Sequence, residues 1–135
     1  CFAKGLLCYH KKEYDEALTE LSRIKGNDYV YQLKIKALHT RIYFELDDLE
    51  KVLVIIDSLK HYVSSNLLIP QTFKRRYTNY NNILYKLTRL KLNPDEFKAS
   101  KLIDEIKSST MDDLTTNKTW LLEMAMELKG KLQKN

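Results

Sequence analysis

The sequence predicts an all-α fold made of antiparallel helix pairs that pack against one another. Three observations support this prediction. Apolar residues recur every three or four positions, the spacing that places them on one face of a helix. Only 3 glycines and 2 prolines occur in 135 residues, which leaves little material for the tight turns of a sheet-rich protein. The breaks between the apolar segments are short and polar.

The first two predicted helices span residues 1–11 and 14–24 and form a hairpin. The second helix carries Ala17, Leu18, Leu21 and Ile24 on one face. The polar break Gly26-Asn27-Asp28 ends it. Because the first helix starts at the first residue of the sequence, we expect the chain to be the C-terminal part of a longer protein.

The third predicted helix, residues 28–46, is apolar on two sides. One side carries Tyr29, Leu33, Ala37, Thr40 and Phe44, and the other carries Tyr31, Ile35, Leu38 and Ile42. A helix with two apolar sides must lie between neighbouring helices, because each side has to be shielded from water.

The next three predicted helices have recognisable starts. Asp47 and Glu50 have the spacing of a capping box, which begins a fourth helix that ends near residue 63. After a loop at residues 64–69, Pro70 fits the first turn of a fifth helix that reaches residue 92. Asn93, Pro94 and Glu96 then mark a sixth helix over residues 94–108. The predicted inward face of the fifth helix consists of Phe73, Tyr77, Tyr80, Ile83, Leu84, Leu87 and Leu90.

The seventh predicted helix follows a polar stretch at residues 109–117. Its apolar side consists of Trp120, Leu121, Met124, Ala125, Leu128 and Leu132. Because Glu123, Glu127 and Gly130 face elsewhere, we expect this helix to cap the end of a helical stack. The chain is long enough for a single domain, residues 1–135, with one core.

Two parts of the sequence correspond at an offset of 35 residues. Residues 14–18 align with residues 49–53, and the same offset relates Cys8 to Tyr43 and Leu21 to Ile56. A period of about 34 residues, each a helix-turn-helix, is typical of tetratricopeptide arrays. Gly5, Tyr14 and Ala17 hold the relative spacing of that family's glycine, tyrosine and alanine. Residues 1–64 therefore resemble two degenerate repeats of the tetratricopeptide family.

The resemblance implies a right-handed α-α superhelix of about three helical hairpins plus a C-terminal capping helix. The sequence departs from the family pattern at Cys1, Lys4 and Cys8, and in the second repeat Thr40 and Val52 replace the glycine and alanine. A helical bundle with coincidental spacing is the alternative interpretation, and it is all-α too.

Charge and cysteine content give an expected location but no partner. The net charge of +5 is mild, because 23 Lys and Arg are interspersed with 18 Asp and Glu. Cys1 and Cys8 lie seven residues apart on one helical face, where a disulfide would be geometrically awkward. We interpret both as reduced and expect a cytoplasmic, intracellular protein. No segment approaches the roughly 20 apolar residues of a membrane span.

The sequence gives no sign of an enzyme, a metal site or a cofactor. His10, His39 and His61 are not in metal-binding pairs, and Gly5, Gly26 and Gly130 are too far apart to form a phosphate-binding loop. The carboxylates gather at Asp47-Asp48-Glu50, Asp95-Glu96, Asp104-Glu105 and Asp112-Asp113. Most of these lie near predicted helix starts, which favours capping over acid-base catalysis.

The family resemblance predicts a protein-interaction scaffold that binds a partner segment in a concave groove. The residues at the family's groove positions are Phe2, Leu6, Tyr9 and His10 from the first helix, and Lys34, Ala37, Arg41, Phe44 and Glu45 from the third. In the family's chaperone-binding members, lysines and asparagines at these positions hold a C-terminal carboxylate. That pattern is missing from the first repeat of this chain. The aromatic residues suit an apolar helix or an extended segment instead, or they pack on a missing upstream repeat. The open N-terminal helix is also a candidate surface for self-association.

The fifth helix offers an alternative site. Lys74, Arg75, Lys86 and Arg89 fall on one arc opposite its apolar face, with Tyr85 at the edge. Basic side chains beside an aromatic ring suit a nucleic acid or a phosphopeptide. With four phosphate contacts, the logarithm of the binding constant would change with the logarithm of the salt concentration by a slope of only about −3 to −4. Such binding is weak, so nucleic acid is the less favoured partner.

Overall fold

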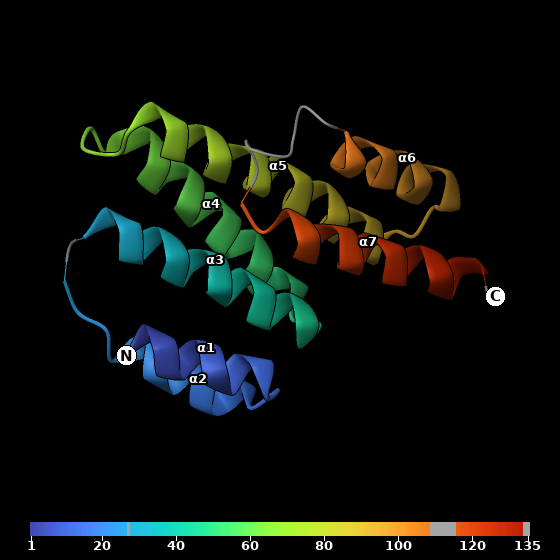
Figure 1. The fold of residues 1–135 in the computed structure, drawn as a ribbon. Helices are drawn as coiled ribbons and strands as arrows, with labels where there is room; N and C mark the ends of the chain where they lie inside the picture. Colours follow the sequence, from blue (N-terminus) through green and yellow to red (C-terminus); the bar gives the residue numbers. More distant parts are fainter. Residues whose placement is uncertain (27, 109–115, 134–135) are drawn as a thin grey trace. The chain divides into compact units, whose positions relative to one another are not determined.

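The chain is all-helical, as predicted. The computed structural model describes residues 1–26, 28–108 and 116–133, and this part of the chain contains seven α-helices and no strand (Figure 1). The first six helices begin and end within two residues of the predicted positions. Asn27, Asp112 and Asp113 and most of the predicted polar stretch 109–117 lie outside the described residues. The helices are α1 (Phe2–His10), α2 (Tyr14–Ser22), α3 (Tyr29–Glu45), α4 (Leu49–Ser65), α5 (Gln71–Leu92), α6 (Glu96–Lys107) and α7 (Lys118–Gln133).

The chain forms two compact units, Cys1–Ile55 and Ile56–Asn135, and the boundary falls within α4. In the first unit, α1 and α2 form a hairpin that packs against α3. The core of the first unit is a cluster of buried side chains that joins the three helices: Tyr9, Ala17, Leu21, Ile35, Leu38 and Ile42.

The α1–α2 hairpin depends on small residues where the helices meet. Ala17 is completely buried. A methyl group added at Gly5 would lie 3.1 Å from Leu21 Cδ2 and 3.6 Å from the Ala17 carbonyl oxygen. A larger side chain at Gly5 would therefore force the helices apart.

Helices α1 and α3 end in the same way. After α1, the amides of Lys12 and Glu13 donate to the carbonyl oxygens of Tyr9 and Cys8, each at 2.9 Å. After α3, the amides of Asp47 and Asp48 donate to Phe44 and Tyr43 at 3.1 and 2.9 Å. Both patterns are Schellman motifs. The four donor and acceptor positions correspond at the predicted offset of 35 residues.

The predicted N-terminal cap of α4, Asp47, lies one residue before the observed cap, because Asp47 belongs to the Schellman motif after α3. Asp47 has a left-handed φ of 62° and belongs to the end of α3. Asp48 immediately precedes α4, and its Oδ1 accepts a hydrogen bond from the Lys51 amide at 3.4 Å. Asp tolerates the left-handed conformation because its short polar side chain can bond locally, so the first aspartate closes one helix and the second begins the next.

Helix α3 is buried on two sides, as its sequence predicts, but Tyr31 is 50% exposed and Tyr29 is half-buried, so the first turn departs from the prediction. Buried residues are Leu33, Ile35, Ala37, Leu38, Thr40, Ile42 and Phe44. Val52, at the position that corresponds to Ala17, is also fully buried.

In the second unit, α5 packs against both α6 and α7. Six of the seven predicted inward residues of α5 are buried, and Phe73 is half-buried. Helices α6 and α7 also pack against each other. Helix α7 packs on α6 and on α5, and its role as the cap of a helical stack stays a prediction. Of its predicted apolar side, Trp120, Leu121 and Ala125 are buried.

The start of α6 differs from the prediction by two residues. Asp95 is the N-terminal cap, and its carboxylate accepts a hydrogen bond from the Lys98 amide at 2.9 Å. Asn93 instead ends α5, with its amide donating to the Arg89 carbonyl oxygen at 2.9 Å. The prediction of Asn93 as cap was wrong because the asparagine still belongs to the preceding helix. The Pro70 prediction was wrong by one residue, since Pro70 caps α5 and Gln71 begins it.

Candidate binding surfaces

The predicted groove positions of α1 and α3 contain a polar network. The Tyr9 hydroxyl donates to the Glu45 carboxylate and accepts from Arg41 Nε at 3.1 Å. The Tyr14 hydroxyl donates to the same carboxylate at 3.3 Å. Arg41 also stacks over the Tyr9 ring, 4.8 Å from its centroid. The network ties α1 and α2 to the C-terminal end of α3.

The network makes both tyrosines harder to ionise. Burial and then the hydrogen bond to Glu45 raise the pKa of Tyr9. Burial and then the negative charge of Glu45 raise the pKa of Tyr14. Both hydroxyl groups therefore remain hydrogen-bond donors at neutral pH, which is the state that the network requires.

The groove residues differ in accessibility. Tyr9, Ala37 and Phe44 are buried, so their side chains are not presented to a partner in this conformation. His10 and Lys34 are exposed, and the remaining four positions are half-buried: Phe2, Leu6, Arg41 and Glu45. The accessible groove positions are therefore more polar than the sequence suggested.

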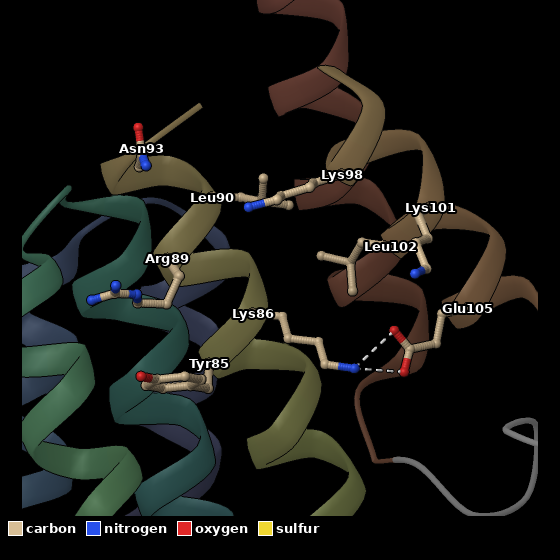
Figure 2. A pocket seen from close by; sticks show the side chains of 9 residues that line it. All are labelled: Tyr85, Lys86, Arg89, Leu90, Asn93, Lys98, Lys101, Leu102 and Glu105. Carbon is tan, nitrogen blue, oxygen red and sulfur yellow. Dashed lines mark hydrogen bonds and ion pairs between the residues drawn. The ribbon is translucent and has the colours of Figure 1, made fainter. Parts of the chain in front are cut away.

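A cleft of about 450 Å³ lies between α5 and α6 in the second unit (Figure 2). Volumes of roughly 300–1,000 Å³ are typical of ligand sites in proteins. The cleft is lined by Tyr85, Lys86, Arg89, Leu90 and Asn93 from α5 and its end, and by Lys98, Lys101, Leu102 and Glu105 from α6. We call this site the α5–α6 cleft.

The polar side chains of the α5–α6 cleft are mainly basic. Lys86 points across the cleft to Glu105, and its Nζ lies 2.9 and 3.2 Å from the two carboxylate oxygens (Figure 2). Lys98 extends toward Leu90, while Arg89 and Tyr85 extend from the other flank of α5 (Figure 2). Within the described residues, Arg89, Lys98 and Lys101 form no ion pair with a carboxylate.

The floor of the α5–α6 cleft is apolar. Leu90 and Leu102 are only 6% and 3% exposed, so water reaches little of either side chain. Tyr85 is about half exposed and adds an aromatic surface at one edge. The cleft thus combines an apolar floor with cationic walls.

The cleft contains part of the predicted basic face and adds residues that the prediction missed. Tyr85, Lys86 and Arg89 line it, but Lys74 and Arg75 lie ten or more residues earlier on α5 and do not. Lys98, Lys101 and Glu105 were missed. Their spacing of three and four residues places them on one face of α6, but the sequence does not reveal that this face borders α5.

The net positive charge is confined to one of the two units. Cys1–Ile55 contains 9 Lys and Arg and 9 Asp and Glu, whereas Ile56–Asn135 contains 14 and 9. The second unit therefore carries the whole charge of +5. Its field favours negatively charged partners over positively charged ones.

The described residues offer no arrangement for metal binding. No group of three or more His, Cys, Asp or Glu side chains in this part of the chain could hold an ion. His10 and His61 are exposed, His39 is half-buried, and His61 lies 3.5 Å from Asp57. No helix among the described residues has the length and apolar character needed to cross a membrane.

Comparisons of the chain with protein-family models, with curated proteins and with solved structures found no match.

Proposed function

We propose that this chain is a non-catalytic protein-interaction module that holds a negatively charged partner in the α5–α6 cleft. The main supporting observation is that Lys86, Lys98 and Lys101, from two different helices, meet around a cleft of about 450 Å³. Because the charges come from two packed helices, they can contact a bound ligand from both sides of the cleft.

The charge balance of the lining residues supports the same proposal. Four cationic side chains line the cleft together with one carboxylate, that of Glu105. Clustered like charges repel one another, and an anionic partner relieves that repulsion. The excess positive charge of the whole second unit would attract the same partner over a longer range.

The test is an NMR titration of the ¹⁵N-labelled chain with polyaspartate at low salt. We expect amide shifts that concentrate on residues 85–93 and 98–105 and that weaken between 50 and 200 mM salt, values of the order at which surface charges are screened. The double variant Lys98→Glu/Lys101→Glu should lose these shifts. Lys74→Glu/Arg75→Glu, which changes the charge equally outside the cleft, should keep them.

The proposal is wrong if the two double variants weaken polyaspartate binding equally, because the effect would then come from net charge alone. Shifts confined to residues 1–55 would also contradict it. If duplex DNA or RNA binds the same residues more tightly than polyaspartate, the partner is a nucleic acid.

The groove of the first unit is the second candidate, and the observation in its favour is the exposure of His10 and Lys34 beside the half-buried Phe2 and Leu6. Its use would fit a protein scaffold of the tetratricopeptide type. His10→Ala/Lys34→Ala leaves the core intact and should abolish partner binding if the groove is used. Substitution of Tyr9 or Phe44 is a poor test, because both are buried and their loss would destabilise the unit.

We also propose that residues 1–64 are two degenerate tetratricopeptide-like repeats. The matching helix ends after α1 and α3, at an offset of 35 residues, support this. So does the close approach of α1 and α2 at Gly5. An experimental structure of the chain in which successive hairpins stack with a left-handed superhelical turn, or do not stack, would overturn the proposal.

A further inference from the structure

We propose that the α5–α6 cleft recognises a short acidic protein segment that carries one large apolar side chain, and that Glu105 takes the place of a ligand carboxylate when the cleft is empty. This inference rests on the proposed function. It adds the chemical class of the partner and a competing carboxylate, Glu105, that sets the affinity of the cleft for the partner.

The apolar requirement follows from the lining of the cleft. Most of the lining surface is apolar, and because Leu90 and Leu102 are nearly buried, this area comes mainly from the half-exposed Tyr85 ring and the aliphatic parts of the basic side chains. Displacing water from this lining favours an apolar ligand side chain, since the free energy scales with the apolar area that is covered. A purely charged ligand would leave this contribution unused.

The acidic requirement follows from the walls. Lys98 and Lys101 are both exposed and stand one helical turn apart on α6. Carboxylates on either side of an apolar residue in a bound segment could pair with these two lysines. The cleft volume holds only a few side chains, which fits a short segment and not the width of a duplex.

The ion pair between Glu105 and Lys86 suggests that Glu105 competes with a ligand carboxylate for the lysine. Its two oxygens accept hydrogen bonds from Lys86 in the manner expected of a ligand carboxylate. Both side chains are substantially exposed, 53% for Lys86 and 41% for Glu105. An ion pair in such a setting contributes little to stability, so a ligand carboxylate can replace Glu105 at small cost.

The experiment measures fluorescence anisotropy of labelled nine-residue peptides on the full chain. The first peptide has a central Leu flanked by Asp and Glu. The second replaces Leu by Ser, and the third replaces every Asp and Glu by Asn and Gln. We expect the Ser peptide to bind about tenfold more weakly than the first, and the amide peptide to show no binding.

Variants of the chain locate the site and test the role of Glu105. Glu105→Gln should tighten binding of the Leu peptide about three- to tenfold, because Lys86 is released and a negative charge is removed. Glu127→Gln removes an equal charge from the exposed face of α7 and is the matched control. Lys98→Glu/Lys101→Glu should weaken binding at least tenfold, and circular dichroism of each variant confirms that it is folded.

The outcomes separate this inference from the proposed function. Equal binding of the Leu and Ser peptides, or equal effects of Glu105→Gln and Glu127→Gln, would overturn the inference and leave an anion-binding cleft. Failure of every acidic peptide and of polyaspartate would overturn both. Tighter binding of a single-stranded oligonucleotide, or self-association abolished by Lys98→Glu/Lys101→Glu, would identify a different occupant and overturn the inference.

Discussion

At the scale of single residues, Lys12 has an unfavourable backbone conformation in the first hairpin. Lys12 has a φ of 62° at the end of α1, in the region that glycine adopts at no steric cost. Other L-residues pay roughly 1–2 kcal/mol there. The Schellman hydrogen bonds that join α1 to α2 hold the lysine in this conformation.

Lys12→Gly should therefore stabilise the chain by about 1 kcal/mol, because the left-handed strain is removed. Urea unfolding followed by circular dichroism measures the change. Lys11→Gly is the control, since Lys11 has an ordinary φ of −82° and glycine there should only increase the entropy of the unfolded chain. If both glycine variants lower stability to the same extent, the strain assigned to Lys12 is absent.

A second residue-scale prediction concerns His39, which is half-buried on α3. Burial and then the charge of Lys36 lower the pKa of this imidazole. The unfolded chain consequently binds a proton more readily than the folded chain, so stability should fall as the pH drops below about 6.5, the ordinary histidine value.

Replacing His39 by Gln should reduce this loss of stability, because no group at that position is then protonated. The free energies of unfolding of the two proteins at pH 8 and pH 5 provide the measurement. An identical difference between the two pH values in both proteins would show that His39 does not contribute.

Some residue-scale features were beyond sequence reasoning. The sequence places Tyr9, Arg41 and Glu45 at groove positions, but it does not reveal that they bond to one another. Asn81 is another example: it lies on the buried side of α5 and donates to the Ile56 carbonyl oxygen at 2.9 Å. Such contacts depend on side-chain positions in space, for which apolar spacing gives no signal.

At the scale of helices, the sequence was far more informative. Apolar spacing located the first six helices to within two residues, because burial of one face is what stabilises each helix. The errors fall at the ends, where neighbouring polar residues compete for the same cap. Asp47 and Asp48 are one such pair, and Asn93 and Asp95 are another.

The cap at Asp95 also matters for the cleft, because it orders the first turn of α6, where Lys98 lies. Asp95→Ala should destabilise the chain by about 1 kcal/mol and increase hydrogen exchange at the Lys98 amide, which would lose its acceptor. Asp104→Ala, on an exposed position of the same helix, should change neither quantity. Unaltered exchange at Lys98 in Asp95→Ala would contradict the capping role.

At the scale of the whole molecule, the uneven distribution of charge could be read from the sequence only once the two units were known. Interspersed charges suggested an ordinary solvated surface. The division at residues 55 and 56 shows instead that the first unit is neutral and the second carries +5. Charges outside a binding site and charges inside it act on different steps of association.

This difference gives a kinetic prediction for the acidic Leu peptide. Lys74 and Arg75 lie outside the α5–α6 cleft, so Lys74→Glu/Arg75→Glu should slow association several-fold at low salt and leave dissociation nearly unchanged. Lys98→Glu/Lys101→Glu removes contacts in the complex and should accelerate dissociation at least tenfold. Stopped-flow measurements at two salt concentrations separate the two rates.

The steering effect should fade at high salt, where long-range attraction is screened, while faster dissociation should persist because the contact itself is lost. If both variants changed only the association rate, the lysines of α6 would be steering charges too, and the peptide would bind elsewhere.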